Sequence, residues 1–388
     1  MQAGRVMSRA ACRLFVWIVS CAVTVLGAVD ADGVDRHAPD FVHVSLVVAA
    51  PGDDLMSAVG HVCLRLECPT FKLDNCFSCE HEKASAPFLS VFFERLRMGL
   101  FAFPTDQFLK SYREEGRRVV AYPLDLPPDM KLRLWRHLDE TVAKGAEGRY
   151  DYVRRACTVA VLEQLRATVA PHMFAFPPWP PSYARTRREI FHDAIGQIPW
   201  SRAFLHMAVG TAFDSTESEF EKVILPADLV ALLAETAIDG RPVLNLVAAR
   251  ELLPQRAPRP KGAPLTPLVA ASTLLCAAVG NAFCPRLWKG VGVLFGAILS
   301  VLAALLVYFY AVSDLPTTNW NWLLVPFNPL FVLGWRWRRK WGLAAGVLLV
   351  LWSVGMCVAP HRLTDLSFVV LSLAFAVFYA SQRERKPV

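Results

Sequence analysis

The chain has 388 residues, of which 54% are hydrophobic, and its mean hydropathy is +0.34. This apolar excess excludes an ordinary soluble protein, because it is concentrated at the N-terminus and after residue 264, with a long soluble-looking region between. The net charge of +7 does not indicate nucleic-acid binding, since much of the basic charge lies beside apolar segments, where it orients membrane proteins. These basic residues are Arg336, Arg338, Arg339, Lys340, Arg383, Arg385 and Lys386.

The N-terminus has the features of an export signal. Three arginines precede the apolar run 14–29, and acidic residues follow it. We therefore expect residues 1–30 to be a signal peptide or an uncleaved anchor. A lipoprotein-type signal at Cys21 fits less well, because the apolar run continues past this residue.

Two strands are predicted after the signal, at 41–48 and 60–67, and a turn-forming stretch separates them. The second strand alternates strictly, so its polar and reactive side chains share one face. These side chains are His61, Cys63, Arg65 and Glu67.

Four cysteines and a histidine form a cluster: Cys63, Cys68, Cys76, Cys79 and His81. Export would permit disulfides among the four cysteines, whereas the Cys-x-x-Cys pair would also permit a structural zinc site. The spacing matches no familiar zinc module well. We therefore expect one or two disulfides and no metal, with zinc as the alternative.

Further strands are predicted at 88–93 and 117–126, with helices at 104–115 and from 129 to 143. The pattern contains no repeated strand–helix–strand unit and no glycine-rich phosphate loop. It therefore favours an α+β domain without a nucleotide cofactor.

A helix is predicted to begin at Cys157, because Val161, Leu162, Leu165 and Val169 recur on one face. Cys157 would then lie at the helix start and at the edge of the buried face. Unpaired backbone N–H groups and the positive end of the helix dipole favour a thiolate there. The residue is thus a candidate nucleophile, although a small buried core cysteine is the alternative.

His61 and Cys157 are the best candidates for a reactive pair. Thiol chemistry needs a thiolate, a base and donors for an oxyanion, and a strand histidine facing a cysteine at a helix start would provide them. Both residues could instead serve packing. No Ser-His-Asp motif and no His-Glu-x-x-His motif was found.

Helices are predicted at 184–197 and 225–239, followed by a basic, proline-rich linker at 254–264. We therefore divide the chain into an exported domain at 38–253, this linker, a membrane domain at 265–382 and a cytoplasmic tail at 383–388.

The membrane domain contains five apolar segments, at 265–284, 290–312, 320–335, 341–359 and 364–380. If the preceding domain is exported, five crossings leave the basic clusters at 336–340 and 383–386 in the cytoplasm, and only His361-Arg362 opposes the positive-inside rule. This places the protein in the cytoplasmic membrane with its domain on the periplasmic or outer side.

The third apolar segment carries Asn319, Asn321 and Asn328. Amides are costly in hydrocarbon and usually face protein or a cavity. The three residues therefore indicate either a lipid-binding site at the outer leaflet or an interfacial anchor with amides that pack helices together.

Several short stretches together resemble the periplasmic domain of the Lnb-type lipoprotein acyltransferases, by their order and spacing. In the exported domain they are 60–65, 112–117, 119–126 and 150–157. The likeness continues at 199–200, 210–214, 225–226, 319–321 and 328–330. The order of histidine before cysteine is also similar to permuted relatives of the papain and NlpC-type folds.

The resemblance implies a Cys–His active site, which carries over to Cys157 and His61. Arg65, Arg117 and Tyr150 become candidate supporting residues only by their place in the matched stretches. The family often has Asn before the cysteine, whereas this chain has Ala156, which weakens any role for that amide.

The implied function is lipoprotein maturation: Cys157 would take an acyl chain from a diacylglyceryl lipid and pass it to the α-amino group of a lipoprotein. The implied partners are bacterial lipoproteins and membrane lipids. Two rivals remain, a membrane-tethered cysteine peptidase or amidase and a non-enzymatic envelope protein. The sequence does not indicate the oligomeric state.

Overall fold

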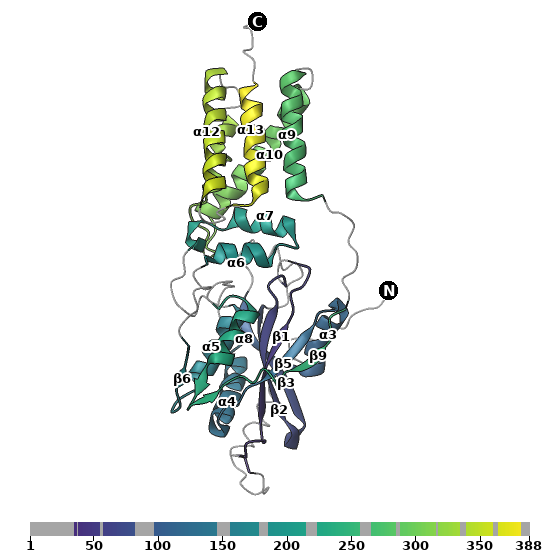
Figure 1. Ribbon diagram of the computed structural model, residues 1–388, viewed down its shortest axis with the longest axis vertical. Coiled ribbons are helices and arrows are strands. Elements are labelled where there is room, and N and C mark those ends of the chain that lie inside the picture. Colours follow the sequence, from purple (N-terminus) through teal and green to yellow (C-terminus); the bar gives the residue numbers. More distant parts are fainter. Residues whose placement is uncertain are drawn as a thin grey trace.

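The computed structural model describes residues 35–36, 38–54, 57–81, 97–145, 156–177, 185–214, 223–256, 265–284, 288–315, 317–333, 339–359 and 364–381. The predicted signal, the predicted strand at 88–93, Tyr150 and the C-terminal tail lie outside these residues. A sheet-rich N-terminal part and a helical C-terminal part occupy opposite ends of the long axis (Figure 1).

The main sheet has six antiparallel strands in the order β4-β3-β2-β1-β5-β9. Their bounds are β1 His43–Ala49, β2 His61–Cys68, β3 Leu73–His81, β4 Met98–Pro104, β5 Val119–Pro123 and β9 Arg250–Leu253. The predictions of β1, β2 and β5 are confirmed to within a few residues. The sequence analysis missed β3 and β4, because the cysteine cluster of β3 was interpreted only as disulfide or zinc chemistry.

Helices cover both faces of this sheet. The first face packs on α4 (Pro128–Lys144), α5 (Cys157–Ala167) and α8 (Pro226–Glu235), and the second packs on α3 (Thr105–Glu115). Leu46, Val62 and Leu64 belong to the first core, whereas Val47 and Cys63 belong to the second. The strict alternation predicted for β2 thus places successive side chains in two different cores. Each fully buried aliphatic side chain stabilises the fold by about 1.5–3 kcal/mol.

A second, three-stranded sheet consists of β6 (Phe174–Ala175), β7 (Ala237–Ile238) and β8 (Arg241–Pro242). His172 connects it to α4, since its Nε2 lies 3.1 Å from a carboxylate oxygen of Asp129 and its Nδ1 contacts Asp239.

The helical part comprises α9 (Pro267–Phe283), α10 (Trp288–Ala311), α11 (Pro329–Leu333), α12 (Arg339–Val358) and α13 (Leu366–Ala380). Among the described residues, two helical stretches are long and apolar enough to cross a membrane, Gly290–Ala311 and Trp341–Val358. α9 and α13 are apolar but shorter.

The third apolar segment, predicted at 320–335, is not one continuous helix. It contains the short 3-10 helix η6 (Trp322–Leu324) and the five-residue α11. Prolines at 326 and 329 lack the N–H groups that a continuous helix would need, and Asn328 Oδ1 accepts from Leu330 N at 3.0 Å to start α11. The segment still follows α13 along its length, with Phe327 against Phe368 and Phe331 against Tyr379.

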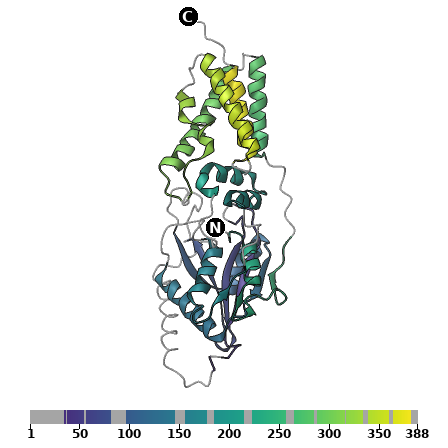
Figure 2. The same cartoon turned by 60° about the vertical axis from the view of Figure 1, so that its left-hand side comes forward.

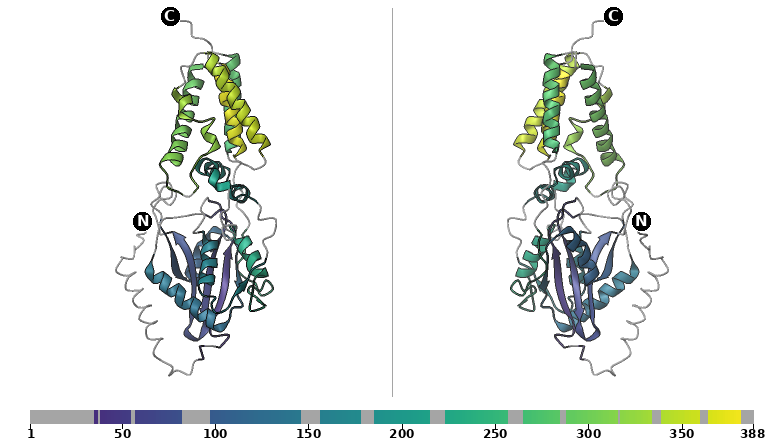
Figure 3. Two further views of the ribbon diagram at one scale, coloured as in Figure 1. Left: turned by 90° about the vertical axis from the view of Figure 1, so that its left-hand side faces the viewer. Right: turned by 90° about the vertical axis from the view of Figure 1, so that its right-hand side faces the viewer.

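The two parts meet through α6 (Arg187–Ala194), α7 (Pro199–Ala208) and the 3-10 helix η3 (Thr211–Asp214). α6 and α7 lie between the sheet and the helical bundle in every view (Figures 2 and 3). Backbone hydrogen bonds join this region to the bundle, with Gly210 N donating to Thr317 O and Thr211 N donating to Trp320 O.

Gly210→Ala should destabilise this junction by about 1–3 kcal/mol, because the new Cβ would lie 2.6 Å from the backbone oxygen of Asn319. Thermal unfolding of the detergent-solubilised full chain measures the effect. Gly355→Ala is the matched control, since its Cβ would meet nothing within 4 Å. An equal melting temperature for Gly210→Ala and wild type would contradict the close approach.

The His172 bridge should make stability depend on pH. Hydrogen bonds to Asp129 and then Asp239 raise the pKa of His172 above 6.5, while Asp129 has its pKa lowered to about 2 and stays charged. A histidine whose pKa is higher in the folded than in the unfolded state stabilises the folded protein. This contribution is complete at pH values below the unfolded-state pKa, and it is lost as the pH rises through the folded-state pKa. Between pH 6 and pH 9, the melting temperature of wild type should therefore fall by more than that of His172→Gln. His137→Gln, farther along α4 than Asp129, is the control and should show the same dependence on pH as wild type.

Candidate active site

The candidate site forms where β2 and β3 separate. Their ladder runs from Cys68–Leu73 to Leu64–Phe77 and then ends, although both strands continue to His61 and His81. Ala49 pairs with both His61 and Val119, and Val119 pairs with Leu253, the last residue of β9. β2 therefore begins at the end of the sheet where β9 ends. This end of the sheet faces α6 and α7 (Figure 1).

Cys157 is the first residue of α5, as predicted, and it is half-buried. The helix is held by the predicted apolar face, with Val161, Leu162 and Leu165 all buried. Thr158 is fully buried and donates its hydroxyl to Val223 O at 2.6 Å, which ties the helix start to the segment before α8. The cysteine is therefore held at a defined place.

The sulfur of Cys157 lies against the backbone of β2. It is within hydrogen-bonding reach of the N–H groups of Val62, Thr158 and Cys157 itself. Val62 follows His61 directly, so the cysteine meets the backbone of β2 next to the predicted histidine. Cys157 packs against the core of α4, α5 and α8, whereas the His61 ring lies beside Phe108 of the α3-facing core. Three N–H groups around one sulfur also form a set of donors that could stabilise negative charge.

Desolvation by its surroundings nevertheless raises the pKa of the Cys157 thiol, and the carboxylate of Glu80 acts in the same direction. The backbone hydrogen bonds lower this pKa, but by less. The prediction that the helix start favours a thiolate is therefore wrong for the free protein. The thiol is protonated at neutral pH and needs a base in order to react.

His61 begins β2 after a sharp turn. Gly60 has φ +86°, and a Cβ there would lie 2.8 Å from Ala49 O, so the turn requires glycine. His61 Nε2 lies 2.7 Å from Ser78 Oγ and 4.0 Å from Glu80 Oε1. Both partners belong to β3.

The sequence analysis missed Ser78 and Glu80. Ser78 is fully buried, and the side chain of Glu80 is about one-third exposed, at 35%. Phe77-Ser78-Cys79-Glu80 alternates between apolar and polar residues, and this short period-two pattern could have indicated the strand.

The candidate supporting arginines serve other contacts. Arg65 holds Asp74 through two hydrogen bonds of 2.7 Å, farther along the sheet. Arg117 Nε donates to Ala50 O at 2.7 Å, and its guanidinium lies 4.7 Å from the centre of the Tyr112 ring. These contacts connect elements of the domain. The third candidate, Tyr150, lies outside the described residues.

The four clustered cysteines are all free thiols in this structure, so the predicted disulfides are not formed. Cys63, Cys68 and Cys76 are buried and Cys79 is half-buried. Cys63 and Cys76 share a hydrogen bond in the α3-facing core, while Cys68 packs in the opposite core. Within the described ranges, no group of three or more His, Cys, Asp or Glu is arranged to hold a metal ion.

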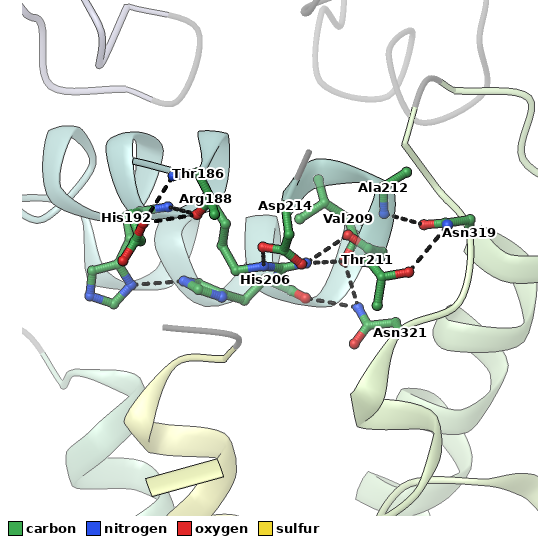
Figure 4. Close-up of polar contacts among 12 residues, drawn as sticks. Thr186, Arg188, His192, His206, Val209, Thr211, Ala212, Asp214, Asn319 and Asn321 are labelled. Atoms are coloured by element: carbon green, nitrogen blue, oxygen red, sulfur yellow. Dashed lines mark hydrogen bonds and ion pairs between the residues drawn. The ribbon is translucent and has the colours of Figure 1, made fainter. Parts of the chain in front are cut away.

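The three asparagines of the third apolar segment are engaged within the protein. Asn321 Nδ2 donates to the carbonyl oxygens of His206, Met207 and Val209, at 2.8–3.0 Å (Figure 4). These carbonyl groups lie at the C-terminal end of α7. Asn319 accepts from Ala212 N at 3.0 Å. Asn328 Nδ2 donates to Val325 O at 2.9 Å.

These contacts favour the packing interpretation of the amides over the lipid-binding one. Asn321 and Asn319 join the bundle to a polar region that contains Arg188, paired with Asp214 at 2.9 Å, and His206, 2.8 Å from His192 (Figure 4). These contacts thus fix the end of α7 and η3 on the bundle.

Residues 35–183 match the family model described as the Lnb N-terminal periplasmic domain. The match includes both His61 and Cys157 and ends before α6. The searches of curated proteins and of solved structures found no match.

The raised pKa of Cys157 can be tested by alkylation. The rate at which iodoacetamide modifies Cys157, followed by peptide mass spectrometry, should rise with a midpoint above that of a short cysteine peptide. Cys157→Ser identifies the modified peptide. A midpoint below that of the free peptide would contradict the dominance of desolvation and restore the expected helix-start thiolate.

Proposed function

We propose that this chain, which carries an Lnb-type periplasmic domain at residues 35–183, is a membrane-bound thiol acyltransferase of lipoprotein maturation. The observation that carries the proposal is the contact of Cys157, at the start of α5, with the backbone beside His61 in the matched domain. It supports a nucleophile and a base in one place.

In the proposed first step, His61 takes the proton of the Cys157 thiol as the sulfur attacks an ester carbonyl of a diacylglyceryl lipid. The S–C bond forms and the ester C–O bond breaks. The leaving alkoxide recovers the proton from His61 and departs as an alcohol. Because the thiol pKa is raised, a base is required at this step.

In the second step, the free α-amino group of a lipoprotein's N-terminal cysteine attacks the acyl-thioester. The N–C bond forms, the C–S bond breaks, and the amine proton returns to the Cys157 sulfur by way of His61. The N–H groups of Val62 and Thr158 are the candidate donors for the oxyanion in both steps.

The helical part would hold the lipid substrate near the active site. Two helical stretches have the length and composition of membrane spans, and we propose five crossings in all, one of them the broken segment. Tyr310, Trp320 and Trp322 form a chain of exposed rings with centroids 6.1 Å apart, which is typical of a membrane interface. They lie beside Thr211, so the sheet-rich domain would stand directly above the outer leaflet of the cytoplasmic membrane.

The proposed partners are bacterial lipoproteins and membrane lipids. The rival activity is that of a cysteine peptidase or amidase of the envelope, which would use the same thiol with water as the acceptor. Transfer requires that the amine reach the thioester before water does, so the product identifies the activity.

The decisive measurement is the mass of the N-terminal lipopeptide of an envelope lipoprotein, in a host that lacks any other N-acylating enzyme. Wild type should add one N-linked acyl group, whereas Cys157→Ala and His61→Ala should abolish it, because they remove the nucleophile and the base. Cys68→Ala, at the far end of β2, is the matched control and should retain activity.

Identical lipopeptides from wild type and Cys157→Ala would refute the acyltransferase proposal. Cleavage of an envelope peptide that depends on Cys157 would then support the rival hydrolase.

A further inference from the structure

Two polar side chains of β3 lie on the same sheet face as His61. In the β2–β3 register, His61 is opposite Glu80 and Cys63 is opposite Ser78 once the ladder is extended from Leu64–Phe77. We propose that Ser78 and Glu80 are positioning residues that hold His61 in the orientation and protonation state needed for proton transfer with Cys157. This inference rests on the proposed role of Cys157 and His61.

Ser78 determines the orientation of the imidazole. Its Oγ lies 2.7 Å from His61 Nε2, and the residue is completely buried, so water does not compete for this hydrogen bond. This hydrogen bond fixes the direction in which the ring faces. The Phe108 ring of α3 lies beside the imidazole, with the two ring centroids 6.4 Å apart.

Glu80 determines how readily the imidazole accepts a proton. Its Oε1 lies 4.0 Å from His61 Nε2, which is too far for a hydrogen bond but close enough to stabilise an imidazolium. When the Sγ–H bond of Cys157 breaks and an N–H bond forms on the imidazole, the positive charge develops beside this carboxylate. The same carboxylate disfavours a free thiolate, so it couples deprotonation of the sulfur to protonation of His61.

The other described titratable groups near His61 do not take the role proposed for Glu80, because each has a partner of its own or is a buried neutral group. Cys63 and Cys76 are buried thiols that hydrogen-bond to each other, and Tyr112 of α3 is a buried phenol beneath the Arg117 guanidinium. Farther along the sheet, the charge of Arg65 is paired with Asp74. Glu80 thus supplies a carboxylate 4.0 Å from the imidazole.

The test uses the full-length protein in detergent and p-nitrophenyl butyrate as the acyl donor. Release of p-nitrophenolate in the first turnover reports acylation of Cys157, and Cys157→Ala gives the background. The rate should fall at low pH as His61 becomes protonated. Glu80→Gln should move this acid limb down by about 0.5–1 pH unit, because loss of the carboxylate weakens the base. Glu80→Asp should restore at least half of the shift.

Ser78→Ala should lower the maximal acylation rate about tenfold while changing the half-saturating ester concentration less than twofold, since it removes orientation and not ester binding. The matched control is Glu67→Gln. Glu67 belongs to the same sheet face, and its side chain is 33% exposed compared with 35% for Glu80, but its partner is Arg65. Its pH profile should equal that of wild type.

An unchanged acid limb in Glu80→Gln overturns the inference, and so does an equal shift in Glu67→Gln. A wild-type protein with no burst that depends on Cys157 overturns it as well, because His61 would then have no thiol to serve. The lipopeptide assay is independent of these outcomes. Shifted acid limbs together with unmodified lipoproteins would leave the positioning role standing and remove only the acyltransferase proposal.

Discussion

The rest of the candidate site depends on the contact between the start of α5 and the start of β2. The buried Thr158 anchors the helix to Val223, and the Cys157 sulfur meets the Val62 amide where β2 has left its ladder with β3. A continuous ladder would use the strand edge for backbone pairing. Its early end leaves N–H donors for the cysteine and gives His61 room to meet side chains of the neighbouring strand.

Burial has opposite effects on the two halves of this site. Desolvation raises the pKa of the Cys157 thiol, which favours its protonated form. The same low-dielectric surroundings strengthen the hydrogen bond between His61 and Ser78 and the influence of Glu80. Reactivity would therefore arise through proton transfer within the pair, and not from a thiolate that already exists.

The junction between the two parts determines where this chemistry takes place. Gly210 allows the backbone of Asn319 to approach closely, and Asn321 satisfies the carbonyl oxygens that end α7. Arg202 adds a 2.7 Å contact with Asp365 at the start of α13. Amides that looked suited to lipid binding are thus used to hold α7 and η3 on the apolar helices.

The sequence by itself determined the features that depend on local periodicity. Alternation identified β2 and put His61 on one of its faces, helical spacing put Cys157 at a helix start, and long apolar runs indicated the membrane helices. Tertiary structure decided the rest. Ser78 and Glu80 meet His61 only through strand pairing, and the pKa of Cys157 depends on desolvation by distant segments. The third apolar segment is broken locally, by its two prolines and by the bonds of Asn328 to its own neighbours, but the carbonyl oxygens that Asn321 meets belong to α7, and no local pattern records that contact.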